Sequence, residues 1–225
     1  MSEVPRPRLA VRGPAGQVRA IALVLHGGRA NSHEPAAARQ PAALRMVPFA
    51  RSLERAGGSC GLAVWSLGYR YRGWNGAEAS PVPDARWALD LIRQRHGDPP
   101  VALVGHSMGG RTALRIADDP LVRSVAALAP WLPDGEPTGA VAGRQVLIMH
   151  GTDDQTTDPR ASLAYALHAP AERIAAISVL REGHAMLRRP GTWHRLTTGF
   201  VLGSLGCAAM PPELDAAWNE APVVI

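Results

Sequence analysis

Short apolar runs alternate with helix-period segments along most of the chain, and this alternation restricts the fold more than any other feature. The apolar runs cover residues 20–25, 61–67, 101–104, 122–128, 146–150 and 174–180. The helix-period segments cover 42–56, 83–96, 108–118, 159–168 and 192–203. Near-continuous apolar strands separated by helices are typical of a mostly parallel sheet covered by helices on both faces. We therefore expect a three-layer α/β fold, with residues 6–12 as a short antiparallel edge strand.

Nothing in the sequence divides the chain into parts. Its 225 residues suit one large domain, and no repeat, low-complexity tract or linker interrupts them, so we expect a single domain over 1–225. No apolar run is long enough to span a membrane, and the first 20 residues lack the apolar core of a secretory signal. The expected location is therefore the cytoplasm. Residues 210–225 are assigned to no element.

The net charge of +5 and the pI of 10.2 raise the question of a nucleic-acid partner. Lysine is absent, however, and the arginines are scattered, with no run longer than the pair Arg188-Arg189. A basic tract or a known binding motif is missing. We expect neither a nucleic-acid nor a membrane partner, and the oligomeric state stays open.

The chain has two cysteines, Cys60 and Cys207, which lie far apart in the sequence. Cys60 adjoins an expected buried strand, where a free thiol behaves as a small apolar side chain. The sequence favours two unpaired structural thiols, and no Cys/His cluster has the spacing of a zinc site. We expect no metal and no cofactor.

The sharpest chemical signal is a G-x-S-x-G motif (GHSMG) at residues 105–109, followed by Gly110. It directly follows the apolar strand VALV and directly precedes the helical run RTALRIA. A tight strand–turn–helix connection exposes the serine of this motif as a nucleophile, beside backbone N–H groups at the start of a helix. Ser107 is the candidate nucleophile; the alternative is a serine that only caps the helix.

A serine nucleophile needs a general base, which a third group orients. The histidines that follow the expected acid-bearing strand are His168, His184 and His194. His168 and His194 fall in expected helices, whereas His184 lies in a loop directly after the last apolar strand. Loops at the carboxyl ends of strands are where such sheets build their sites. His184 is therefore the candidate base.

Three aspartates follow the strand at 146–150 and compete for the role of the acid. Asp158 precedes Pro159 at an expected helix start, where capping explains it. Spacing alone does not separate Asp153 from Asp154.

From about residue 20 to 187 the chain resembles the α/β-hydrolase superfamily. The resemblance rests on HGG at 26–28, GHSMG at 105–109, HGTDD at 150–154 and GH at 183–184. It implies that Asp154 is the triad acid. It also implies an oxyanion hole formed by the backbone N–H groups of Met108 and Gly28, with Arg29 as the less suited second donor.

Many members of this family carry a helical cap before the acid-bearing strand. Here only the fifteen residues 130–144 fill that interval, rich in proline and glycine, so we expect an open site. Arg29, Trp74 and Trp131 are candidate substrate contacts, and Arg70 or Arg72 is available to a substrate carboxylate. The resemblance implies a serine esterase acting on a small-molecule ester. A thioesterase is the alternative, and a catalytically silent binding protein with this fold is a third reading.

Overall fold

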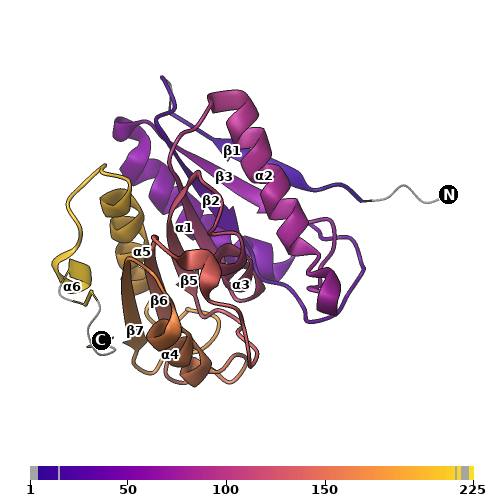
Figure 1. Cartoon of the computed structure of the whole chain (residues 1–225), viewed down its shortest axis with the longest axis vertical. Coiled ribbons are helices and arrows are strands. Elements are labelled where there is room, and N and C mark those ends of the chain that lie inside the picture. Colours follow the sequence, from indigo (N-terminus) through magenta and orange to yellow (C-terminus); the bar gives the residue numbers. More distant parts are fainter. Residues whose placement is uncertain (1–4, 15, 216, 219–222) are drawn as a thin grey trace.

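The computed structural model describes residues 5–14, 16–215, 217–218 and 223–225. Its centre is a sheet with the strand order β1-β3-β2-β4-β5-β6-β7-β8 (Figure 1). β1 pairs with β3 in the antiparallel sense, and the other neighbouring strands are parallel. The strands are β1 (Arg8–Arg12), β2 (Ala20–Leu25), β3 (Leu62–Gly68), β4 (Val101–His106), β5 (Val122–Leu128), β6 (Gln145–Gly151), β7 (Arg173–Val179) and β8 (Val223–Val224).

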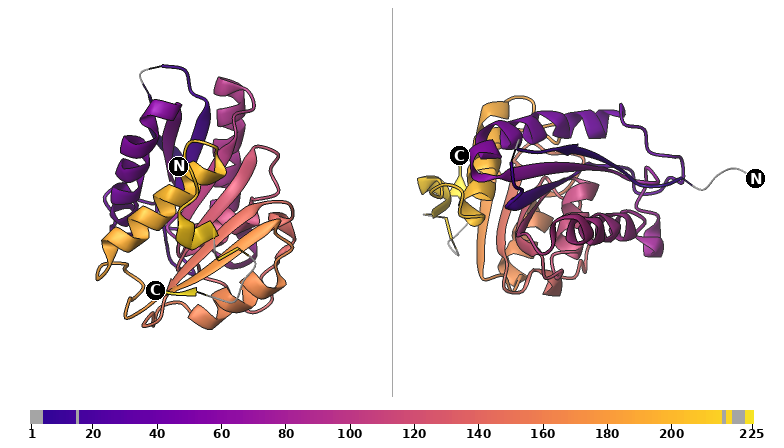
Figure 2. Two further views of the ribbon diagram at one scale, coloured as in Figure 1. Left: turned by 90° about the vertical axis from the view of Figure 1, so that its left-hand side faces the viewer. Right: turned by 90° about the horizontal axis from the view of Figure 1, so that it is seen from above.

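Helices cover both faces of this sheet. The α-helices are α1 (Pro41–Gly57), α2 (Pro81–His96), α3 (Met108–Arg115), α4 (Pro159–His168), α5 (Pro190–Ser204) and α6 (Pro212–Asp215), and the short 3-10 turns are η1 (Gly58–Cys60), η2 (Gly76–Glu78) and η3 (Gly139–Val141). Seen from above, α1 and α5 lie on one side of the sheet and α2 on the other (Figure 2). No helix in the described ranges is both long enough and apolar enough to cross a membrane.

Alternation along the buried strands produces two separate cores, because successive side chains of a strand point to opposite faces. Leu23 and Leu103 pack with the helices α2, α3 and α4. Val24 and Val104, their neighbours in sequence, pack with α1 and α5. A strand that is buried on both faces must be apolar at every position, which explains the continuous apolar runs of the sequence.

The expected architecture is confirmed, including the antiparallel edge strand, although some boundaries shift. β4 continues to His106 instead of ending at residue 104, because its last residues still pair with β5. The unassigned tail provides α6 and the edge strand β8, and the Leu180 N–H donates to the Ile225 carbonyl at 2.8 Å. Residues 130–144 form a loop with only η3 in it, so no helical cap stands before β6.

The expectation of unpaired cysteines is wrong. Cys60 and Cys207 form a disulfide, with their Cα atoms 5.7 Å apart, across 147 residues of sequence. The cause is the packing of α1 against α5 on the same face of the sheet, where the hydroxyls of Ser52 and Thr198 lie 2.9 Å apart. This packing brings the turn after α1 beside the turn after α5, and a count of cysteines contains no information about it.

Candidate active site

Ser107 lies in the sharp turn between β4 and α3, in a strained backbone conformation with φ 56° and ψ −120°. Positive φ is rare for a residue with a side chain and marks positions that the surrounding structure holds in place. Here the Ser107 N–H donates to Leu128 at 3.0 Å, and the Ser107 carbonyl accepts from Arg111 at 3.1 Å and from Trp131 at 3.2 Å. These backbone contacts fix the turn, and none of them uses the Ser107 hydroxyl.

The glycines of the motif are required by close approach of backbone. A β-carbon on Gly105 would lie 2.1 Å from the Gly109 carbonyl oxygen, and one on Gly109 would lie 2.3 Å from the Leu25 carbonyl oxygen. Real β-carbons do not come this close to backbone atoms. The motif therefore packs the start of α3 directly against the end of β2, where the expected oxyanion loop begins.

The two residues expected to supply the oxyanion donors, Gly28 and Met108, are in contact. A β-carbon on Gly28 would lie 2.4 Å from the Met108 methyl carbon and 2.4 Å from the Arg72 carbonyl oxygen, so only glycine fits there. The Arg29 N–H is already used, because it donates to the Arg72 carbonyl at 2.8 Å. The geometry thus favours Gly28 over Arg29 as the partner of Met108.

His26 orients the peptide between Gly27 and Gly28. Its Nδ1 lies 2.6 Å from the Gly27 carbonyl oxygen, and since a carbonyl only accepts, Nδ1 carries the proton. The C=O and N–H groups of a planar trans peptide point in opposite directions. By holding the Gly27 carbonyl, His26 therefore sets the direction of the Gly28 N–H, which points away from the His26 ring.

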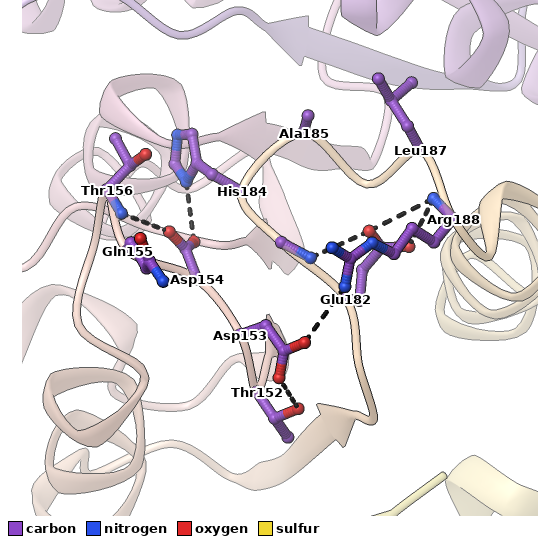
Figure 3. Close-up of a pocket in the computed structure, with 11 residues that line it drawn as sticks. Thr152, Asp153, Asp154, Gln155, Thr156, Glu182, His184, Ala185, Leu187 and Arg188 are labelled. Atoms are coloured by element: carbon purple, nitrogen blue, oxygen red, sulfur yellow. Dashed lines mark hydrogen bonds and ion pairs between the residues drawn. The ribbon is translucent and has the colours of Figure 1, made fainter.

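Asp154 and His184 meet across the loops that follow β6 and β7. The Asp154 Oδ2 lies 2.8 Å from the His184 Nδ1 (Figure 3). A carboxylate only accepts hydrogen bonds, so Nδ1 carries a proton, and in the neutral imidazole Nε2 is then the unprotonated nitrogen. This is the tautomer that a general base needs.

The Asp154 carboxylate is buried and receives several hydrogen bonds. Its Oδ2 lies 3.1 Å from His150 Nε2 and accepts from the Thr157 hydroxyl at 2.9 Å, while Oδ1 accepts from the N–H groups of Thr156 and Thr157 at 2.8 and 3.0 Å. Burial alone would raise the pKa of Asp154, but the hydrogen bonds from His150, His184 and these N–H groups hold that pKa well below its usual range. Asp154 is therefore ionised, as the orientation of His184 requires.

Asp153, the competing aspartate, has different surroundings. It forms an exposed ion pair with Arg188, at 3.1 Å between Oδ2 and Nη1, on the side away from His184 (Figure 3). The structure thus distinguishes Asp154, which contacts His184, from Asp153, which pairs with Arg188.

His106 connects the turn of Ser107 to the loop of His184. Its Nε2 donates to the His184 carbonyl at 2.9 Å, and the two rings are 4.7 Å apart between centroids. Burial, together with the nearby His184, lowers the pKa of His106 to about 3, so the ring is neutral. Among the hydrogen bonds of the described residues, none joins the Ser107 hydroxyl to the His184 ring, and the link between the two residues runs through His106.

The loop of His184 has two further anchors that the sequence did not reveal. Glu182 is 1% exposed, and its carboxylate accepts from the backbone N–H groups of Gly183, Arg188 and Arg189 at 3.0, 3.1 and 2.7 Å. Arg45 of α1 donates to the carbonyl of Ala185. A Glu-Gly-His sequence does not show that its glutamate turns inward, so only the folded structure identifies this role.

Trp74 and Trp131 meet edge to face, with the Arg111 guanidinium close to both rings, and this changes the expectation for one of them. Trp74 is 3% exposed and belongs to the core, so it is not a direct substrate contact. The Arg111 guanidinium lies 3.8 Å from the Trp74 ring centroid and 4.7 Å from that of Trp131. Trp131 is half-buried and next to the Ser107 carbonyl, so it remains a candidate wall of the site.

Neither arginine expected to meet a substrate carboxylate is free. Arg70 pairs with the buried Asp84, whose carboxylate also accepts from the Arg70 N–H at 2.8 Å, and Arg72 pairs with Glu34. Arg29 remains exposed, with its backbone bridged to Gly73. Of the expected charged contacts, the described structure leaves only Arg29 as a candidate.

An open groove of about 750 Å³ runs along the His184 loop, from Thr156 to Arg188 (Figure 3). The described residues contain no group of three or more His, Cys, Asp or Glu side chains arranged to hold a metal ion. Of the candidate triad, Asp154 and His184 line the groove.

Comparisons with known proteins agree with this fold. A family model described as alpha/beta hydrolase fold matches residues 22–144. No curated protein sequence matches the chain.

Solved structures are similar in fold at low sequence identity. Est1E from Butyrivibrio proteoclasticus has a TM-score of 0.67 and 12% identity, with 90% of this chain and 96% of that one covered. A monoacylglycerol lipase from Paleococcus ferrophilus gives 0.65 and 15%, with coverage of 88% and 99%. XC6422 from Xanthomonas campestris, described as an α/β serine hydrolase without lid, gives 0.62 and 17%, with coverage of 87% and 88%.

The matched family segment runs from β2 through the Ser107 turn and the loop before β6, which is more than half of the chain. The strand order and the serine turn after β4 agree with it. The chain therefore belongs to the alpha/beta-hydrolase fold family.

Proposed function

We propose that this protein is a serine hydrolase that cleaves carboxylic esters, with Ser107 as nucleophile, His184 as general base and Asp154 as the acid that orients the base. The observation that carries the proposal is the 2.8 Å contact between Asp154 and the His184 Nδ1. In the neutral imidazole this contact places the proton on Nδ1 and leaves Nε2 as the acceptor, in a loop that His106 ties to the Ser107 turn.

The reaction follows from these groups in two halves. His184 Nε2 takes the proton of the Ser107 hydroxyl while Ser107 Oγ attacks the ester carbonyl, and the N–H groups of Met108 and Gly28 stabilise the oxyanion. The protonated His184 then gives its proton to the departing alcohol, which leaves an acyl-enzyme. Water, deprotonated by His184, releases the carboxylic acid and restores the serine.

The open site favours substrates with short or medium acyl chains. Only the loop at 130–144 stands where a cap would close, and an apolar chain gains at most about 0.8 kcal/mol for each methylene that it buries. Without a lid to open, we expect no jump in activity when a triglyceride such as tributyrin passes its solubility limit. The partner in this proposal is a small-molecule ester, with neither nucleic acid nor membrane involved.

A fluorophosphonate probe tests the nucleophile. It should label Ser107, and Ser107→Ala should abolish the labelling. A panel of p-nitrophenyl esters of increasing acyl length, beside acyl thioesters, then tests the substrate. A higher kcat/KM for thioesters would identify the alternative, a thioesterase, and a folded protein with neither labelling nor turnover would reject hydrolysis altogether.

The cytoplasmic location expected from the sequence is a prediction that the Cys60–Cys207 disulfide puts to the test, since disulfides persist mainly in oxidising compartments. Alkylation of thiols at the moment of cell lysis separates the two cases. Alkylated Cys60 and Cys207 would support the cytoplasm, and protected cysteines would contradict it.

A further inference from the structure

A second cavity, of about 240 Å³, lies between α1 and the edge of the sheet formed by β1 and β3. The strands β1, β2 and β3 form its floor, α1 forms its roof, and residues 36–38 close one end. It shares no lining residue with the groove along the His184 loop. The cavity is therefore a separate site.

Short side chains on both walls create the space. The floor presents Ala10, Ser66 and Gly68, and the roof presents Ala43 and Ala50. The three consecutive alanines at 36–38 continue the same lining at the end wall. With Val24 and Met46 behind them, these residues offer an interior that suits an aliphatic chain.

Positive charge lies on the same face as the apolar floor. Arg8, Ala10 and Arg12 alternate along β1, so their side chains point to one side, and the contact of Arg12 with Glu54 of α1, at 3.5 Å, shows that this side faces the cavity. Arg12 thus has an acidic neighbour already. Arg8 is exposed and forms no ion pair with any residue in the described part of the chain.

The inner wall of the cavity reaches the oxyanion loop. His26 and Tyr69 line it, with their rings in edge contact at 4.6 Å between centroids. His26 is the residue that holds the Gly27 carbonyl and thereby sets the direction of the Gly28 N–H. A ligand in the cavity would contact the ring on which that orientation depends.

We propose that this cavity binds a medium-chain aliphatic carboxylate, with the chain between α1 and the sheet and the carboxylate at Arg8. The apolar lining favours an aliphatic chain, and the Arg8 guanidinium at the rim favours a carboxylate. The volume of the cavity limits the length of the chain. The proposal goes beyond the proposed function, because binding here requires no reaction at Ser107.

Calorimetry with octanoate tests the site on the Ser107→Ala protein, in which no turnover occurs. Ala10→Phe should fill the cavity, and the edge strand β1 should accept the aromatic ring because aromatic residues are favoured in strands. Val11→Phe is the control, because it places the same ring on the opposite face of β1. We expect Ala10→Phe to abolish octanoate binding and Val11→Phe to leave it within about twofold. Equal binding by both variants, or no binding by the parent protein, would overturn the proposal.

Charge reversal tests the position of the carboxylate. Arg8→Glu should weaken octanoate binding roughly threefold or more, whereas Arg6→Glu, at an exposed position outside the cavity, should not. Octylamine, with the same chain and the opposite charge, should bind less tightly than octanoate. Equal effects of the two reversals would reject Arg8 as the anchor. Because all arms use the Ser107→Ala protein, failure here is distinct from failure of the fluorophosphonate test.

Discussion

Two loops at the carboxyl edge of the sheet each contain one buried glutamate, but the two carboxylates contact different kinds of donor. Glu182, in the loop after β7, accepts from backbone N–H groups of its own loop. Glu136, in the loop before β6, accepts from the side chains of Arg111 and Arg115 on α3. The first fixes the path of a backbone that carries His184, and the second fixes a wall that includes Trp131.

The difference indicates which kinetic constant each loop controls. A general base acts in the transition state, so an error in its position lowers kcat, and a 1 Å displacement costs about 100-fold. A wall that holds the substrate equally in ground and transition states affects KM alone. We therefore expect Glu182 to act on kcat and Glu136 to act on KM.

The largest effect is expected at Asp154, which lies at the centre of the first region. Asp154→Asn should lower kcat about 10⁴-fold, because an amide no longer holds the required His184 tautomer. Asp153→Asn is the matched control, and it should change kcat little, since Asp153 pairs with Arg188 at the surface. Steady-state kinetics on both folded variants checks this, and a larger loss from Asp153→Asn would reverse the assignment of the acid.

Glu182→Ala is expected to lower kcat about ten- to a hundredfold with a smaller change in KM. Three backbone N–H groups lose their acceptor, so the loop and His184 with it lose their fixed position. Glu182→Gln retains one acceptor oxygen and should recover part of the loss. Kinetic constants measured together with the melting temperature distinguish a loosened His184 loop from an unfolded protein. A rise in KM at constant kcat would contradict the expectation that the two loops control different kinetic constants.

Glu136→Gln should raise KM several-fold, roughly three- to tenfold, and leave kcat within about twofold. The amide lacks the negative charge that pairs with Arg111 and Arg115, and the Arg111 guanidinium lies against the rings of both Trp74 and Trp131. Kinetics with a short and a medium p-nitrophenyl ester measures the effect. If kcat falls as steeply as with Glu182→Ala, the two loops are not distinct in function.

The smallest expected effect is on the pH dependence of stability, through His106. Its pKa of about 3 in the folded state lies below the 6.5 or so of the unfolded chain, so between these values the unfolded state binds more protons. The stabilisation is complete above pH 6.5 and is lost as the pH falls toward 3. His106→Gln should reduce the slope of the unfolding free energy between pH 6 and 4, by at most about 1.4 kcal/mol per pH unit.

Urea unfolding across that pH range provides the measurement. An unchanged slope in His106→Gln would show that this ring is not the group that titrates in that range.

Much of the fold could be predicted because its signals are local. The runs at 20–25 and 122–128 match β2 and β5 to the residue, since β2 is apolar and buried throughout and β5 is so except at Arg123 and Ser124. The turn at Ser107 is likewise local, because its glycines are required by contacts within the motif and with the end of β2.

The rest depends on contacts between distant segments. The sequence alone could not show that Glu182 and Glu136 turn inward, since both look like surface residues until their loops are folded. In the sequence Arg70 is available to a substrate carboxylate, but in the structure it pairs with the buried Asp84 of α2. Trp74 is a candidate site residue in the sequence, but in the structure it belongs to a core formed by distant segments and contacts Arg111.

The disulfide between Cys60 and Cys207 also determines the covalent connectivity of the candidate active site. It closes a loop across 147 residues, which in a chain-entropy account restricts the unfolded state by about 5 kcal/mol. Ser107, Asp154 and His184 all lie inside that closed loop, whereas Gly28 and all of α1 precede it. A single cut inside the loop leaves one molecule as long as the disulfide is intact. A cut of the backbone between Gly28 and α1 leaves the segment that carries Gly28 attached by non-covalent contacts alone.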